Sequence, residues 1–387
     1  MGSLLLALIY LCFISLGLPD SLLGSAWPVL HKEINVSVSM AGVVSMTICA
    51  GTILSSLLSE KLLRKFGAGL VTAVSCAMTA VGLLSFSISN SFPMLILSSV
   101  PYGLGAGAVD AILNNYVALH YKAQHMSWLH CMWGVGASIS PCIMSYSLVS
   151  LNNWSYGYLI VCIIQFIISA VIFFSIPLWK GEASEPSCCV EASYTPIRFK
   201  EIISTKRAIP CFITFFAYCA LEVTTSLWAS SYLVDKWNFT PETAAGLASL
   251  FYIGVTLGRF ANGFLAMRLS DHYLIRMGIG LIGTGIALLF MSLYSVLTLI
   301  GFVIIGLGCA PIYPCIIHMT PTVFGEEKSQ AMIGIQMAFA YSGFLFAPTI
   351  FGFIADYISI SSLPVFQLIL LILMLVMHEF VVRKDCK

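Results

Sequence analysis

Three acidic residues, Asp20, Asp110 and Glu222, stand deep inside long apolar stretches of the sequence. A carboxyl group in apolar surroundings favours its neutral form, because the charged form loses its water. At the centre of a membrane-spanning helix an acid costs about 2.5–3.5 kcal/mol on insertion scales, so such residues are rarely without a role. A buried carboxyl group that reaches a water-filled cavity can load and release a proton, and the three acids therefore predict proton-transfer chemistry.

A carboxamide accompanies the second of these acids. Asn114 follows Asp110 by four residues, which places the two side chains one helical turn apart on the same face. A carboxylate accepts hydrogen bonds and an amide both donates and accepts, so the pair suits the vicinal hydroxyls of a sugar. The alternative is a hydrogen-bonded clamp between two helices.

Aromatic and imidazole side chains occur in the neighbouring apolar stretches. His130 and Trp133 share a helical face, and Trp228 follows Glu222 in a later stretch. An imidazole donates and accepts hydrogen bonds, and an indole face can stack on a sugar ring. Each residue also has a structural alternative: His130 reaches water at a helix end, the tryptophans pack in the core, and Glu222, one turn from Tyr218, pairs with a helix of the other half of the chain.

Asp20 lies on a helical face that also carries small and aromatic residues. Residues spaced by three and four along a helix point in the same direction. We expect the glycines of this face to leave room for a ligand beside the acid; alternatively, Asp20 caps a kink made by Pro19. The face comprises Gly17, Asp20, Gly24, Trp27 and His31.

The composition indicates which elements hold these residues. Of 387 residues 59% are hydrophobic and 9% are charged, against about 25% charged in soluble chains. The mean hydropathy is +0.95. A helix needs about 20 mostly apolar residues to cross a membrane, and continuous apolar runs exclude spanning strands. We predict an all-α membrane protein with twelve transmembrane helices at 4–30, 38–59, 68–88, 93–119, 127–149, 154–178, 208–234, 241–265, 273–292, 296–319, 329–354 and 361–382.

The basic residues predict the orientation of the spans. Of the 18 lysines and arginines, fifteen fall on one set of loops and the C-terminus, Lys32 and Lys236 fall on the other set, and Arg259 lies within a span. We therefore expect a multi-pass protein of the cell membrane with both termini in the cytosol. His318 and His378 are expected at the membrane interface.

A polar segment divides the spans into six and six. Residues 179–207 are rich in Ser, Pro and Glu, which favours a cytosolic linker over a folded unit. The predicted domains are an N-terminal six-helix bundle over 1–178, the linker over 179–207 and a C-terminal six-helix bundle over 208–387.

The two halves resemble each other at an offset of about 207 residues. Lys61 matches Arg268, and Pro141 matches Pro348 at the same depth of its span. Two parallel repeats predict two pseudo-symmetric bundles, with a ligand site near the bilayer midplane between them. For most of the glycines in the repeat we expect close helix packing.

In the loop after the second span the acid Glu60 precedes the basic residues Lys61 and Arg64, and Arg268 stands at the matching place after the eighth span. These two loops resemble the gating signatures of the major facilitator superfamily. An acid followed by basic residues carries the resemblance, although Ser56 replaces a glycine and Met267 stands where an acid is usual. The resemblance implies a gate on the cytosolic side; the alternative is a positive-inside loop with no further role. The gating residues that it implies are Glu60, Lys61, Arg64, Arg259 and Arg268.

Within that superfamily the chain resembles the fucose:proton symporter family. Residues 20–23 are similar to its Asp-x-Leu-Leu, and residues 110–117 to its acid-x-x-x-Asn-Pro-aromatic-Val, with Asn115 in place of the proline. The resemblance implies that the two acids at the starts of these motifs serve in proton coupling and sugar binding. His130 stands where the fucose carrier has glutamine, which leaves the particular sugar open.

These features predict a secondary transporter that moves a sugar or similar polyhydroxylated solute together with protons by alternating access. The expected partners are that small solute and the lipid bilayer, and the expected state is a monomer. The proposed substrate- and proton-binding residues are Asp20, Asp110, Asn114, His130, Trp133, Glu222 and Trp228.

Other functions receive less support from the sequence. A proton-driven efflux antiporter for amphipathic compounds is the first alternative, but exporters of this fold usually carry Gly-Pro in the fifth span, where this chain has Ser140 before Pro141. A receptor or scaffold would need a structured cytosolic domain. We expect no enzyme, metal or cofactor, because no catalytic or metal-ligand spacing occurs. A net charge of +1 predicts no nucleic-acid partner.

Overall fold

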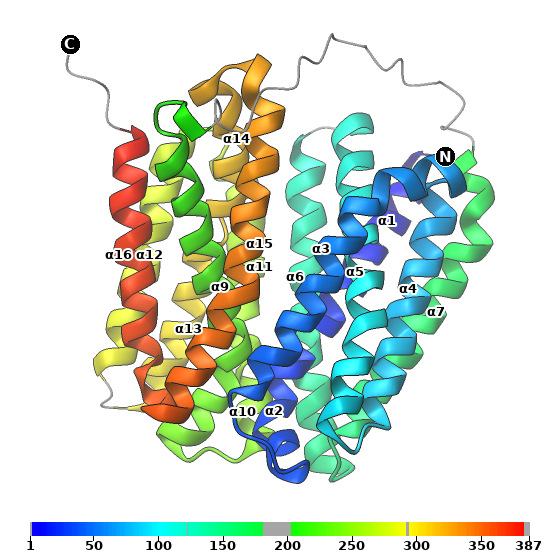
Figure 1. Ribbon diagram of the computed structural model, residues 1–387, viewed down its shortest axis with the longest axis vertical. Coiled ribbons are helices and arrows are strands. Elements are labelled where there is room, and N and C mark those ends of the chain that lie inside the picture. The colour runs from blue at the N-terminus through cyan, green and yellow to red at the C-terminus, as the bar shows by residue number, and fades with distance from the viewer. Residues whose placement is uncertain (1, 122, 181–202, 292–293, 383–387) are drawn as a thin grey trace.

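The chain folds into two groups of helices that stand side by side (Figure 1). A computed structural model describes residues 2–121, 123–180, 203–291 and 294–382, and within these ranges the chain is helical apart from short turns and contains no strand. The predicted linker falls largely on 181–202, outside the described residues, although α7 extends through its first two positions. The first half comprises α1 (Gly2–Asp20), α2 (Leu22–Glu33), α3 (Met40–Phe66), α4 (Ala68–Ser87), α5 (Phe92–His120), α6 (Ala123–Ser150) and α7 (Ser155–Lys180). The second half comprises α9 (Ala208–Trp237), α10 (Pro241–Leu247), α11 (Ser249–Leu265), α12 (Asp271–Met291), α13 (Ser295–Cys309), α14 (Ile312–Phe324), α15 (Glu326–Tyr357), η1 (Ile360–Ser362) and α16 (Leu363–Val382).

The helices confirm the predicted twelve spans. Among the described residues, 11 helical segments are long and apolar enough to cross a membrane. Three of these are broken helix pairs: α1 with α2, α10 with α11, and α13 with α14. The twelfth span is α6, a helix of 28 residues whose serines and histidines make it more polar than the others. Large apolar side chains such as Phe174, which is 80% exposed, cover the outer surface, as expected of helices that face lipid.

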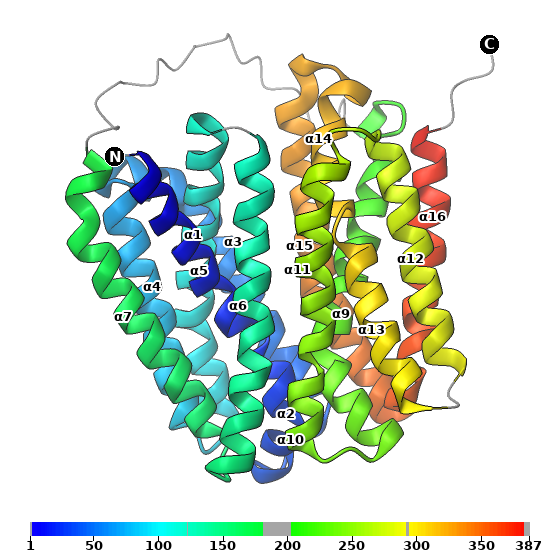
Figure 2. The ribbon, with the colours of Figure 1, turned by 180° about the vertical axis from the view of Figure 1, so that it is seen from behind.

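The contacts between helices show which helices lie at the outer sides and which lie where the two halves meet. α4 packs on α7 and α12 packs on α16 at the two outer sides, whereas α3 meets α15, α6 meets α11 and α2 meets α9 where the halves join (Figures 1 and 2). The first and last helices have their chain termini at the same end, which we call the terminal end (Figure 1). The opposite end, which includes α2 and α10, is called the far end.

Close contacts join the halves toward the far end. The backbone N–H of Ser39 donates to both carboxylate oxygens of Asp356, at 3.2 and 3.3 Å, and the Thr349 hydroxyl donates to the carbonyl of Gly42 at 2.9 Å. A Cβ atom added to Gly42 would lie 2.5 Å from the Cα of Thr349, so α3 and α15 cross with their backbones in contact. These contacts hold the far end of the interface closed.

Candidate functional site

Asp20 stands at a break in the first span. Proline removes a backbone donor, and α1 ends directly after Pro19, with α2 beginning beyond Ser21. The Asp20 carboxylate accepts from the Tyr102 hydroxyl at 3.0 Å and from the indole N–H of Trp133 at 2.8 Å. Its oxygens therefore bind α5 and α6 and do not cap the kink. Asp20 is exposed although it lies midway along its span, so its side chain is accessible at this depth.

Asp110 carries the predicted carboxamide partner. The Asn114 side-chain amide donates to Oδ1 of Asp110 at 2.9 Å and to its backbone carbonyl at 3.0 Å. Both acceptors belong to α5, so these bonds do not form the clamp between two helices. Asp110 is half-buried and lies close enough to Asp20, and to Tyr313 and Tyr341 of the second half, for electrostatic interaction. Its carboxylate therefore lies within electrostatic range of the second half.

An ion pair of the second half completes the polar cluster. Arg259 of α11 lies 3.2 Å from Glu222 of α9, and the two side chains are only 11% and 10% exposed. The guanidinium also donates to the backbone carbonyl of His130 at 3.4 Å and lies 4.8 Å from the ring centre of Trp133. Arg259 thus contacts α6 of the first half. We call Asp20, Trp133, Arg259 and Glu222 the central chain, because each contacts the next.

Aromatic rings surround the central chain. Trp133 meets Tyr252 edge-on with ring centres 6.3 Å apart, and the His130 ring lies 6.0 Å from Tyr313. Tyr102, Tyr252 and Tyr313 were not among the residues that the sequence singled out as ligands. No local pattern marks them, because tyrosine is common in buried helix faces.

Trp228, which was proposed from the sequence as a ligand-binding residue, packs in the core of the structure. Trp228 is fully buried, its indole N–H donates to the carbonyl of Pro348 at 3.1 Å, and its ring packs on Phe351. The Tyr218 hydroxyl is buried without a hydrogen bond, and Glu222 pairs with an arginine of its own half.

The glycines beside Asp20 correct the expectation of space for a ligand. A Cβ atom on Gly17 would lie 2.0 Å from the carbonyl oxygen of Trp133, and one on Gly24 would lie 2.7 Å from that of Leu227. Both glycines let helix backbones approach each other, which is the packing role that small residues have in membranes. Trp27, on the same face, is fully buried, and its indole N–H donates to a backbone carbonyl.

The proposed gating residues divide between two places. Lys61 and Arg64 are exposed near the end of α3, and Arg268 is exposed just after α11. The side chain of Glu60 lies outside the described residues. Arg259, in contrast, lies in the junction of the halves as a member of the central chain.

The two histidines expected at the membrane interface, His318 and His378, lie in the second half. His318 is 80% exposed and 2.7 Å from Asp271, as expected of a residue at the interface. His378, close to the end of α16, is fully buried, with its ring centre 5.5 Å from that of His272. Among the described residues no group of three or more His, Cys, Asp or Glu side chains could hold a metal ion.

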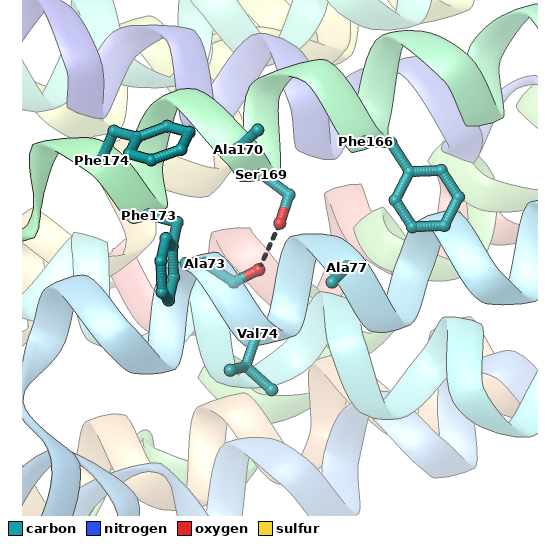
Figure 3. A pocket seen from close by; sticks show the side chains of 8 residues that line it. All are labelled: Ala73, Val74, Ala77, Phe166, Ser169, Ala170, Phe173 and Phe174. Carbon is teal, nitrogen blue, oxygen red and sulfur yellow. Dashed lines mark hydrogen bonds between the residues drawn. The ribbon is translucent and has the colours of Figure 1, made fainter.

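Two cavities lie away from the central chain. One of about 360 Å³ lies between α4 and α7, lined by alanines and phenylalanines (Figure 3). Its Ser169 hydroxyl already donates to the carbonyl of Ala73 at 2.8 Å, so this cavity offers little to a polar solute. The other, about 300 Å³, lies near the far end between α2, α9 and the end of α15, and includes His31, Lys32 and Asp235 in its lining.

Comparisons with known proteins agree with this architecture. The family model of the Major Facilitator Superfamily matches residues 9–207 and 210–385. The glucose/mannose transporter GlcP of Bacillus subtilis is 24% identical, with 79% of this chain and 77% of GlcP covered. The quinolone resistance protein NorA of Staphylococcus aureus is 23% identical, with 90% and 88% covered.

A solved structure shows the same fold. The D-xylose-proton symporter superposes with a TM-score of 0.79 at 13% identity, covering 97% of each chain. The family match spans both halves of the chain, and the two bundles of spanning helices have the arrangement of a solved transporter. The chain is therefore a multi-pass membrane transporter and not an enzyme, and it belongs to the major facilitator superfamily.

Proposed function

We propose that the protein moves a sugar or similar polyhydroxylated solute together with protons. The observation that carries this proposal is the pair of carboxylates, Asp20 and Asp110, at the junction of the halves, where Arg259 is already paired with Glu222. Two acids without a balancing cation in a low-dielectric region favour uptake of protons.

The polar groups of the cluster fit a polyhydroxylated solute. The Asp110 carboxylate and the Asn114 amide supply acceptors and a donor on one face of α5. His130 and Trp133 stand on the neighbouring α6, and tyrosines of the second half lie opposite. A flat ring with hydroxyl edges can stack on an indole while its hydroxyls bond to the acids. GlcP, whose name gives glucose and mannose, provides a reason to test hexoses first.

Protonation supplies the coupling between the solute and the proton. A neutral carboxyl group donates a hydrogen bond and a charged one only accepts, so loading a proton on Asp110 changes the affinity for a hydroxylated solute. Reciprocity then requires the solute to change the proton affinity by the same factor. The contacts at the far end close one side of the site, and alternating access requires them to open in turn.

Transport by purified protein in liposomes tests this function. Labelled D-glucose, D-mannose, D-xylose and L-fucose are offered outside at acidic pH with an alkaline lumen. We expect accumulation of at least one sugar that a protonophore abolishes, in wild type and in the control Asp235→Asn at the far end. A panel without accumulation, or accumulation that a sodium gradient drives and a protonophore spares, contradicts the proposal.

Efflux of amphipathic compounds is the second candidate, favoured by the similarity to NorA over 90% of this chain. The fifth span speaks against it, because Ser140 stands where exporters usually have glycine and donates its hydroxyl to the carbonyl of Leu18 in α1. Proton-driven loss of ethidium from loaded vesicles, with no uptake of any sugar, would select this function.

From the distribution of the basic residues we propose which end of the protein faces the cytosol. The terminal end, with the exposed Lys61, Arg64 and Arg268, faces the cytosol of a monomer in the cell membrane, and 179–207 tethers the halves. Labelling of single cysteines at positions 61 and 235 from either side of sealed vesicles tests the orientation. Reversed labelling would contradict it.

A further inference from the structure

Trp133 is placed between the acid of the first half and the ion pair of the second. Its indole N–H donates to Asp20 at 2.8 Å, and its ring face lies 4.8 Å from the Arg259 guanidinium. The backbone of Trp133 is fixed against α1, since Gly17 leaves no space for a Cβ atom beside the Trp133 carbonyl. The residue therefore belongs mechanically to the first half, while its ring contacts the second.

We propose that Trp133 transmits the charge state of Asp20 to the Arg259–Glu222 pair and so positions the second half. The inference rests on the proposed proton coupling. A charged Asp20 makes a charge-assisted hydrogen bond to the indole N–H, which is stronger than the bond to a neutral carboxyl group. The anionic acceptor also polarises the indole and makes its face more attractive to the guanidinium. Protonation of Asp20 weakens both contacts together.

The second donor to Asp20 lacks this property. The Tyr102 hydroxyl, 3.0 Å from Asp20, can donate or accept, so it adapts to a protonated carboxyl group by rotating its O–H. The indole N–H only donates, and it cannot follow a change at the carboxylate in this way. Tyr102 also stays within the first half. A change in the protonation of Asp20 therefore affects the contact between the halves through Trp133 and not through Tyr102.

The direction of the effect follows from the geometry. With Asp20 charged, the indole holds Arg259 and the halves stay joined at the centre. With Asp20 protonated, the ring holds the guanidinium less strongly, while Arg259 keeps Glu222 and the His130 carbonyl. The halves then separate more easily at Trp133, as the reorientation of a loaded symporter requires.

Other titratable or charged groups lie near Asp20 and near Arg259, the two residues that Trp133 connects. These groups decide which control variants the experiment needs. Asp110 is the second acid near Asp20, so its titration must be separated from that of Asp20. Around Asp20 lie Tyr102 and Asp110 of α5 and Tyr252 of α11. Around Arg259 lie Glu222 and Tyr218 of α9, His130 and Cys131 of α6, Cys309 of α13 and Tyr313 of α14.

A transport comparison tests the role of the indole N–H. Trp133→Phe keeps a smaller aromatic face for Arg259 and removes the donor to Asp20. With D-glucose as the probe, we expect its pH-driven accumulation to fall at least fivefold while exchange at equal concentrations falls less than threefold. Tyr102→Phe should still accumulate D-glucose, with a displaced pH dependence. Trp27→Phe, which loses an indole bonded to a backbone carbonyl, should accumulate like wild type.

A measurement without solute separates this inference from the proposed function. In protein labelled with ¹⁵N-tryptophan, the Trp133 indole signal is assigned by its loss in Trp133→Phe and followed against pH. We expect the signal to change with pH in a single titration, which disappears in Asp20→Asn and persists in Asp110→Asn. In the double variant Arg259→Gln/Glu222→Gln, the midpoint of this titration should shift by at least a tenfold change in proton affinity. A Trp133 signal that ignores Asp20, a midpoint that ignores the ion pair, or equal loss of accumulation in Trp133→Phe and Tyr102→Phe overturns the inference. A titrating signal in a protein that accumulates no sugar would leave the link standing and refute the transport function.

Discussion

The Arg259–Glu222 pair allows a prediction about stability in which the two partners behave differently. Replacing Glu222 by glutamine leaves a buried guanidinium, which cannot lose its proton. Removing one partner of a buried ion pair costs about 3–5 kcal/mol. The side chains are only 11% and 10% exposed, so solvent compensates little of this loss. Because Arg259 keeps the His130 carbonyl and the Trp133 face, we expect the lower limit, about 3 kcal/mol.

The reverse substitution should cost less. Arg259→Gln leaves Glu222 without its partner, but a carboxyl group escapes an unfavourable charge by taking up a proton. We expect a loss of about 1.5–2 kcal/mol, at the lower end of what one hydrogen bond to a charged group contributes. Arg259→Gln/Glu222→Gln leaves no buried charge at the pair and should lie within about 1 kcal/mol of wild type.

Thermal unfolding in detergent, followed by a thiol-reactive dye, measures this order. Cys219 and Cys309 are fully buried and free, so they react only when the second half opens. In order of decreasing stability we expect wild type and the double variant together, then Arg259→Gln, and then Glu222→Gln. Equal losses for the two single variants, or single losses that simply add in the double variant, would show that the pair is not buried and coupled as the structure indicates.

Three further outcomes follow from single contacts. Asp110→Asn mimics the protonated acid permanently and should abolish pH-driven sugar accumulation while sparing some exchange; accumulation like that of wild type would place the coupling proton elsewhere. Gly17→Ala should destabilise the protein by more than about 2 kcal/mol in the same thermal assay, because its Cβ atom would lie 2.0 Å from a backbone oxygen, whereas Gly280→Ala, with open space around it, should stabilise by up to about 1 kcal/mol. Asp356→Asn weakens the far-end contact to Ser39 and should raise thiol labelling of a cysteine at position 39 from the far side several-fold; unchanged labelling would mean that this contact does not hold the far end closed.

The spans and the class of protein could be predicted from the sequence because their causes are local. The length and hydropathy of each apolar run decide whether it crosses a membrane, and the matching prolines at 141 and 348 reveal the repeat without knowledge of contacts. The acids at 20 and 110 stand out for the same reason, since a carboxyl group within an apolar run is costly wherever the helix packs. The pairing of Asp110 with Asn114 is also local, four residues apart on one helix.

Contacts between distant helices decided what the sequence left open. Trp133 and Arg259 belong to different halves, and nothing in either segment indicates that the indole covers the guanidinium. A glycine beside an acid fits a ligand cavity or a helix crossing equally well, and only the neighbouring backbone shows that Gly17 serves the crossing. Trp228 and His378 have the same helical pattern whether they face a cavity, water or the core, and packing buries both. Hydrophobic periodicity records which residues avoid water, whereas the partner of each buried group depends on how the helices are brought together by the whole fold.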